Sequence, residues 1–230
     1  PARLDFTSER ASQLADTVYY NRSANQMLST SRLAPDDKYR LDVAAAPELT
    51  PEQRATLGAK TAGSEKLAKL NKVPESLITA ATEYTREAKT DFDRMVALEA
   101  KLSGEGYYSD GSDQKSRSGH TSERLGTMFE SSILIGDDEQ YATAMAIMAN
   151  HLGVPARVVM GFYPQADPDG TWEVKGTEAH VWVEAQFADV GWVSFDPTPP
   201  RDRTPQTEVP RPKPKPKPQV DPPPNPPEKV

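Results

Sequence analysis

Three residues that lie far apart in the sequence carry side chains suited to nucleophilic or acid–base chemistry. Asp138 stands near the start of a predicted helix, His180 lies on a predicted strand, and Asp196 ends the next predicted strand. A helix N-terminus carries a partial positive charge that stabilises an anion. A histidine facing it can take or give a proton, and a second carboxylate can orient the imidazole. This order of elements predicts that the three side chains meet in one cleft.

The nucleophile of such a site is ordinarily a cysteine, because a helix N-terminus and a neighbouring histidine lower the pKa of a thiol. The chain contains no cysteine, so disulfides and thiolate metal sites are excluded as well. A carboxylate is a poor nucleophile toward an unactivated amide. An aspartate at a helix N-terminus instead accepts backbone N–H bonds, worth about 0.5–2 kcal/mol. We therefore interpret Asp138 as a helix cap rather than an attacking group.

Other interpretations of these three residues stay open. Two carboxylates and one imidazole can bind a divalent cation, although Asp138, His180 and Asp196 do not have the spacing of a local metal motif. Asp138 and His180 could also share a proton in acid–base chemistry. His180 could be a core histidine on its strand, and Asp196 could shape a turn before Pro197. Our prediction is a site without metal or cofactor.

Several further residues have structural interpretations. His151 lies at the end of a predicted helix, where a positive charge is favoured. Arg157 is expected to anchor its strand to a helix through a carboxylate. His120 follows a polar loop and is either exposed or part of the cleft. The tryptophans are expected in the core or the cleft wall rather than in a ligand cage: Trp172, Trp182 and Trp192.

The predicted elements place these residues on helices and strands. Helical spacing of apolar residues predicts a helix pair over 74–103, with Thr90 and Asp93 capping the second helix and glycines 104 and 106 ending it. A short helix follows near 121–131. Residues 138–152 form the clearest helix, which Gly153 ends and Pro155 prevents from continuing. Strands are predicted over 157–163, 179–187 and 191–195.

The two ends of the chain differ from this middle part. Short strands are predicted near 17–20 and 39–43, and a short helix near 51–59. Residues 199–230 hold 13 prolines, with a Lys–Pro alternation over 212–218 typical of polyproline II. We expect a disordered spacer there; the alternative is a ligand of an SH3-type domain. The predicted domains are 1–73 (mixed, with short strands), 74–200 (the site) and 201–230 (a Pro-rich linker).

The charge distribution argues against nucleic-acid binding. Residues 201–230 hold seven Lys/Arg and four Asp/Glu, which leaves 20 basic and 30 acidic residues, a net charge of −10, on residues 1–200. No apolar run of about 18 residues and no signal peptide are visible. Because the chain begins at Pro1, we expect a processed protein or a piece of a longer one.

Four blocks of residues, in order, resemble the bacterial transglutaminase-like superfamily. They are Gly136–Ala142, Leu152–Gly161, His180–Glu184, and Gly191-Trp192 followed by Asp196-Pro197-Thr198. The resemblance runs from about Ser109 to Pro200. It aligns Asp138 with the nucleophilic cysteine of the family, and His180 and Asp196 with the other two members of its triad.

The resemblance implies an α+β fold of the papain-like kind, with helices packed on an antiparallel sheet. It also implies a catalytically inactive module that binds a peptide, protein or cell-wall ligand outside the cytoplasmic membrane, in a parent protein anchored to that membrane. The alternative is an active hydrolase or acyl transferase that uses Asp138, His180 and Asp196, with or without a metal.

Overall fold

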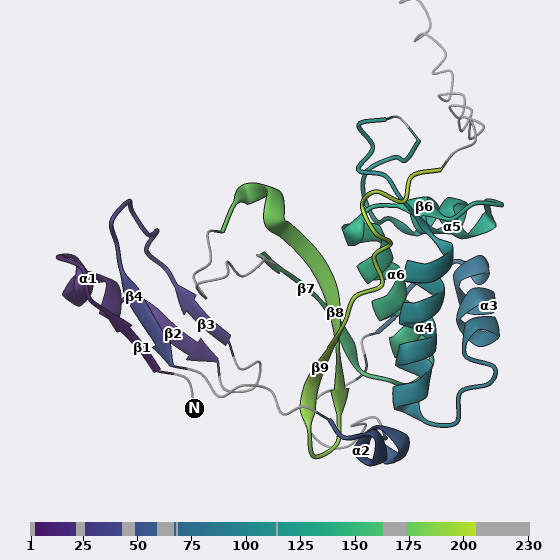
Figure 1. Cartoon of the computed structure of the whole chain (residues 1–230), viewed down its shortest axis with the longest axis horizontal. Coiled ribbons are helices and arrows are strands. Elements are labelled where there is room, and N and C mark those ends of the chain that lie inside the picture. The colour runs from purple at the N-terminus through teal and green to yellow at the C-terminus, as the bar shows by residue number, and fades with distance from the viewer. Residues whose placement is uncertain are drawn as a thin grey trace, which may run out of the picture. The chain divides into compact units, whose positions relative to one another are not determined.

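The computed structural model describes residues 3–21, 26–42, 49–58, 67, 69–113, 115–162 and 174–205. It divides into two compact units, Pro1–Leu49 and Thr50–Val230 (Figure 1). The domain boundaries expected after residues 73 and 200 stay predictions. Most of the Pro-rich linker, from residue 206 onward, and Trp172 lie outside the described residues.

The first unit is a small β-containing piece with a minimal core. Strand β1 (Arg3–Phe6) pairs with β4 (Tyr39–Asp42), β2 (Val18–Asn21) pairs with β3 (Gln26–Ser29), and both pairs are antiparallel. Helix α1 (Ala11–Ala15) buries Leu14 completely, whereas Tyr19 and Leu28, which face each other across β2 and β3, stay exposed. The strands predicted near residues 17–20 and 39–43 correspond to β2 and β4.

The second unit contains the helices that position the site. Thr90 Oγ1 accepts from the Asp93 N–H at 3.0 Å and Asp93 accepts from the Thr90 N–H at 3.1 Å, which confirms the predicted capping box. The break between the paired helices falls at residues 85–90. The helices are α2 (Pro51–Thr56), α3 (Glu75–Tyr84), α4 (Asp91–Glu105), α5 (Ser122–Glu130) and α6 (Asp138–His151).

Helix α4 ends at Gly106 as expected, but not through the left-handed conformation of a terminating glycine. Gly104 lies inside the helix, and Gly106 has a φ of −76° rather than the left-handed conformation of a terminating glycine. A Cβ on Gly106 would instead overlap the buried hydroxyl of Tyr141. Glycine is needed at 106 because helix α6 approaches the backbone closely there.

Helix α6 ends as the sequence predicts. Gly153 has a φ of +88°, and the N–H groups of Gly153 and Val154 donate to Asn150 O at 3.2 Å and Ala149 O at 2.9 Å. These two bonds form a Schellman motif, which satisfies carbonyls that the helix leaves unpaired. The chain then turns directly into the sheet.

The sheet has the order β7-β8-β9 and is antiparallel throughout. A turn with Asp189 at φ 64° and Gly191 at φ 93° joins β8 to β9. A separate parallel pair, β5 with β6, links the start of the loop after α4 to the segment before α6. The strands are β5 (Tyr107–Tyr108), β6 (Ile135–Gly136), β7 (Ala156–Phe162), β8 (Ala179–Phe187) and β9 (Gly191–Phe195); a short 3₁₀ turn, Gly176–Glu178, precedes β8.

The core lies between the sheet and the helices, which gather on one side of it (Figure 1). Alternate residues of β8 are buried toward α6: Val181, Val183, Ala185 and Phe187. Phe92 of α4 packs on Phe187 and Phe195 with ring centroids 5.4 and 5.7 Å apart. Each such side chain contributes about 1.5–3 kcal/mol on burial, so this layer fixes α6 against β8.

This architecture confirms the α+β class, with helices packed on an antiparallel sheet. Among the residues that the structure describes, the helices are all too short or too polar to cross a membrane.

Candidate active site

Two aspartates at the start of helix α6 have different roles. Asp137 is the N-cap: its Oδ1 accepts from the Gln140 N–H at 2.9 Å, and the Gln140 side chain accepts from the Asp137 N–H at 3.4 Å. Asp138 is the first helical residue, and its Oδ1 accepts from the Glu139 N–H at 3.2 Å. The expectation that Asp138 caps the helix is therefore wrong, because Asp137 does so. The second carboxylate oxygen of Asp138 is left to face the sheet.

The structure brings the three predicted site residues together. Asp138 Oδ2 lies 3.1 Å from His180 Nδ1, and Asp196 Oδ2 lies 2.9 Å from His180 Nε2. The side chains of His180 and Asp138 are 12% and 17% exposed, whereas that of Asp196 is 53% exposed. Each ring nitrogen thus faces one carboxylate, and the imidazole lies between them.

This arrangement favours the charged form of all three side chains. Hydrogen bonds to Asp138 first, and then to Asp196, raise the pKa of His180 to about 9 against the opposing effect of burial. Burial opposes the ionisation of Asp138 and Asp196, but the hydrogen bond and charge of His180 hold the pKa of both carboxyls below the ordinary value. At neutral pH the site is a carboxylate–imidazolium–carboxylate row, in which the imidazolium has no lone pair with which to accept a proton.

The geometry of the row does not resemble a metal centre. Because His180 stands between the two carboxylates, the donor atoms of the three residues do not converge on one point. Within the described part of the chain, no group of three His, Cys, Asp or Glu side chains is arranged to hold a metal ion.

The backbone just after β9 and a glutamate of α4 hold Asp196. Its N–H donates to Glu99 Oε1 at 2.7 Å, and its Oδ1 accepts from the Thr198 N–H at 3.0 Å. Burial, and secondarily the charge of Asp196, raise the pKa of Glu99. Sequence reasoning missed Glu99, whose only signal is a carboxylate on a mostly apolar stretch of α4.

A cavity of about 280 Å³ opens beside His180 and Asp196. Arg201 lines it and donates to Thr177 O at 3.0 Å and Ala179 O at 3.1 Å. The cavity therefore offers a carboxylate, an imidazolium and a guanidinium to a ligand. Its lining residues are Thr177, Glu178, His180, Asp196, Thr198, Pro199, Pro200 and Arg201.

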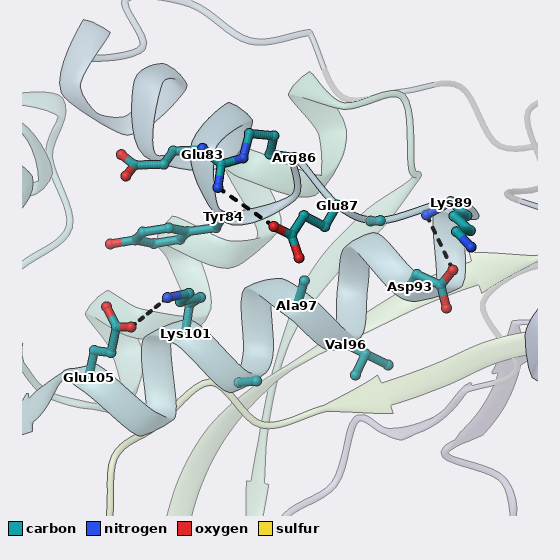
Figure 2. A pocket seen from close by; sticks show the side chains of 12 residues that line it. Glu83, Tyr84, Arg86, Glu87, Lys89, Asp93, Val96, Ala97, Lys101 and Glu105 are labelled. Carbon is teal, nitrogen blue, oxygen red and sulfur yellow. Dashed lines mark hydrogen bonds and ion pairs between the residues drawn. The ribbon is translucent and has the colours of Figure 1, made fainter.

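Two larger hollows lie elsewhere on the unit and do not include the triad residues. Figure 2 shows one of about 640 Å³ along α3 and α4, floored by Tyr84, Val96 and Ala97 and rimmed by charges of both signs. The rim charges pair with one another, as Lys101 does with Glu105 at 2.6 Å. The other, of about 670 Å³, extends from α3 toward Phe129. Neither groups the side chains of a catalytic site.

The other predicted residues have structural positions. Arg157 pairs with Glu184, its register partner on β8, at 2.7 Å, and its guanidinium lies 4.0 Å from the centroid of the Trp192 ring. The expected carboxylate partner is confirmed, but it lies on strand β8 rather than on a helix. Trp182 stacks on His180 with ring centroids 6.4 Å apart. A Cβ on Gly161 would come within 2.8 Å of the Trp182 ring.

The two remaining histidines lie outside the row. His120 is exposed and pairs with Glu139 in the first turn of α6. His151 is exposed in the last turn of α6, as predicted. Neither contributes to the pairing of His180.

Comparison with known proteins places this geometry in a family. The family model described as "Transglutaminase-like superfamily" matches residues 78–197, which include Asp138, His180 and Asp196. An uncharacterized protein of Bacillus subtilis, YebA, is 30% identical over 135 residues, covering 55% of this chain and 18% of the relative. A protein-glutamine gamma-glutamyltransferase of Pseudomonas aeruginosa is 43% identical over 60 residues, covering 25% of this chain and 9% of the relative.

One similar solved structure is the periplasmic domain of TgpA from Pseudomonas aeruginosa, with 25% identity and a TM-score of 0.46 over 57% of this chain and 44% of that one. The chain spans less than a fifth of the length of the curated relatives. The family model nevertheless covers more than half of this chain, including Asp138, His180 and Asp196. The chain belongs to the transglutaminase-like superfamily.

Proposed function

We propose that this chain is a catalytically inactive transglutaminase-like module that binds a ligand in the cleft beside His180. One observation carries the proposal: Asp138, which the resemblance aligns with the nucleophilic cysteine of the family, pairs through its carboxylate with His180 Nδ1 at 3.1 Å. The chain has no cysteine that could replace it.

Two physical effects oppose catalysis by this row. The imidazolium of His180, held between two carboxylates, has no lone pair at neutral pH to act as a general base. The Asp138 carboxylate is stabilised by that imidazolium and by the helix N-terminus, which lowers its nucleophilicity further. The same contacts that order the cleft therefore suppress the chemistry of a triad.

The ligand that we propose is a peptide, protein or cell-wall fragment with polar groups. The cavity of about 280 Å³ presents Asp196, Glu178 and Arg201 within one small space, which suits a ligand carrying both hydrogen-bond donors and acceptors. The Pseudomonas aeruginosa relative is named for action on protein glutamine. A peptide containing an amide side chain is therefore the first ligand to test.

We also propose that the module works outside the cytoplasmic membrane, in a parent protein anchored to it. The support is the order of the four motif blocks and the Pro-rich stretch from residue 199 onward, which suits a spacer. A fusion of a compartment-sensitive reporter to the native protein tests this location.

Activity and binding assays separate the two functions. Incubation with a glutamine-containing protein and a fluorescent primary amine is expected to give no incorporation and no ammonia release. A glutamine-containing peptide is expected to shift the NMR signals of His180 and Trp182, and Asp138→Ala is expected to keep that shift. Turnover that disappears in both Asp138→Ala and His180→Ala would establish the hydrolase or acyl-transferase alternative instead.

A further inference from the structure

A buried arginine lies behind the start of helix α6. Arg124 of α5 is only 6% exposed, and burial lowers the pKa of its guanidinium. Its hydrogen bonds in the described part of the chain all go to uncharged oxygens, including Arg117 O at 2.7 Å and Ile135 O at 3.1 Å. Burying a cation costs free energy unless its N–H donors are satisfied. The position of Arg124 therefore depends on these hydrogen bonds.

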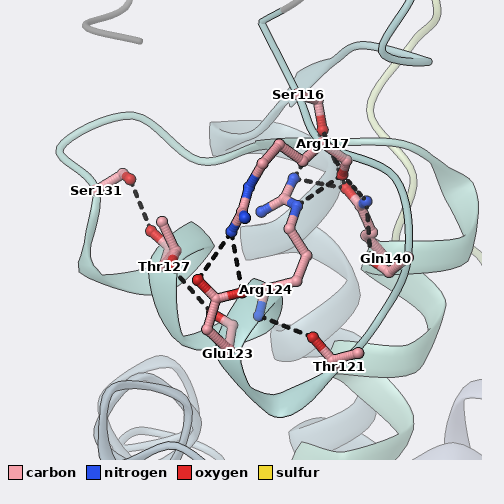
Figure 3. A network of polar contacts seen from close by, with 9 residues as sticks. Ser116, Arg117, Thr121, Glu123, Arg124, Thr127, Ser131 and Gln140 are labelled. Carbon is pink, nitrogen blue, oxygen red and sulfur yellow. Dashed lines mark hydrogen bonds and ion pairs between the residues drawn. The ribbon is translucent and has the colours of Figure 1, made fainter. Parts of the chain in front are cut away.

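Gln140 of α6 is the partner that completes this arrangement. It is fully buried, and its Oε1 accepts from Arg124 Nη2 at 2.7 Å and from Ser116 Oγ at 3.2 Å. Its Nε2 donates to Arg117 O at 2.6 Å and Gly119 O at 3.0 Å. Figure 3 shows the Arg124 guanidinium and the Gln140 amide meeting beneath Ser116 and Arg117. The pair ties the loop after β5 to the first turn of α6.

The same pair fixes the residues on both sides of the N-cap. Arg124 binds the carbonyl of Ile135, two residues before Asp137, and Gln140 forms the capping box with Asp137. A Cβ on Gly136 would come within 2.7 Å of Gln140 Oε1, so the chain is tightly packed there. Asp138 follows directly, and its direction depends on how this turn is held.

We propose that Arg124 and Gln140 are the positioning residues of the cleft, setting the direction in which Asp138 leaves α6 and so its pairing with His180. Neither residue touches His180 in the contacts described, so they act through the N-cap turn. The inference rests on the proposed function for its biological meaning, because it concerns the same cleft. The inference itself concerns only the geometry of the Asp138–His180 pair, which can be measured without a ligand.

An NMR titration of His180 in the full chain tests this proposal without any ligand. Gln140→Met keeps the volume but removes both donors and acceptor, leaving Arg124 without its α6 partner. We expect the pKa of His180 to fall by about one pH unit or more. The reason is that Asp138, an opposite charge 3.1 Å from His180, would move away, and such a charge shifts a pKa by about 1–3 units. Arg124→Met is expected to act in the same direction, and Arg124→Lys, which keeps the charge, to restore part of the shift.

The matched control is Asn150→Ala. Asn150 is a buried amide at the other end of the same helix, where it donates to Ala146 O and Ala156 O at 2.8 and 2.9 Å. We expect this variant to lower the melting temperature without changing the titration of His180. If Gln140→Met does not fold, Gly136→Ala crowds the same amide without removing any of its groups.

The outcomes separate the two proposals. A His180 titration that is unchanged in folded Gln140→Met or Gly136→Ala, or equally changed in Asn150→Ala, overturns the positioning role. Neither result depends on the peptide-binding assay, which can fail or succeed independently.

Discussion

Replacing Asp138 by Asn removes one carboxylate from His180 while keeping the size of the side chain. The shift of the His180 pKa from 6.5 to about 9 corresponds to about 3 kcal/mol at about 1.4 kcal/mol per pKa unit. Asp196 is 53% exposed, so solvent screens its contribution to this free energy. Asp138, 17% exposed and the larger cause of the shift, accounts for about 1–2 kcal/mol. We expect Asp138→Asn to lower the free energy of unfolding by that amount at pH 7.

The pH dependence of this loss follows from the direction of the shift. A group whose folded pKa is raised contributes stability that is complete below its unfolded pKa and disappears as pH rises through the folded value. The difference between the parent chain and Asp138→Asn is therefore expected to be largest near pH 6–7 and to disappear as pH rises through about 9. It also shrinks in acid, where the Asp138 carboxyl of the parent is protonated.

Urea unfolding followed by tryptophan fluorescence measures this difference. All three tryptophans lie within residues 50–230, so the signal reports on the unit that holds the site. The matched control is Asp137→Asn, the same change one residue earlier, because Asn caps a helix as well as Asp does. A loss of stability in Asp138→Asn that is the same at pH 7 and pH 10, or no greater than that in Asp137→Asn, would refute the ion-pair reasoning.

Three further predictions concern the same unit. Asp138→Cys is expected to create a thiol that reacts with iodoacetamide at least about tenfold faster at pH 7 than an exposed cysteine, and His180→Ala in that background is expected to abolish the gain; equal rates would show that the cleft lacks triad geometry. Asp196→Asn is expected to lower the pKa of His180 in an NMR titration, but by less than Asp138→Asn, because Asp196 is more exposed; a larger effect would reverse our ranking. Tyr141→Phe removes a buried hydroxyl that bonds Tyr107 and Leu134, and is expected to cost about 1–3 kcal/mol in urea unfolding; an unchanged midpoint would contradict it.

Local sequence signals predicted the elements that carry the site. Three features each depend on residues close together in the sequence, so they can be recognised without tertiary information: the apolar stripe of α6, its terminating Gly153 and the Thr90–Asp93 capping box. The order helix, strand, strand then predicted that Asp138, His180 and Asp196 would meet.

The sequence could not predict features that depend on distant contacts. Asp137 and Asp138 are both acceptable N-caps, and only the position of β8 decides which of them faces His180. The partner of Arg157 depends on the strand register, and the role of Gly106 depends on Tyr141, which lies 35 residues later. The buried cation Arg124 has no local signal, although the Asp137–Gln140 spacing of a capping box marks one of its partners, Gln140.

The most direct test of this account is the titration of His180 in the unmodified chain. The chain contains three histidines, so the imidazole signals can be assigned with His120→Gln and His151→Gln variants. We predict a pKa of about 9, with both ring nitrogens protonated at pH 7. An ordinary pKa near 6.5, or a neutral ring at pH 7 with one bare nitrogen toward Asp138, would contradict the carboxylate–imidazolium–carboxylate row and return the site to the acid–base chemistry of an enzyme.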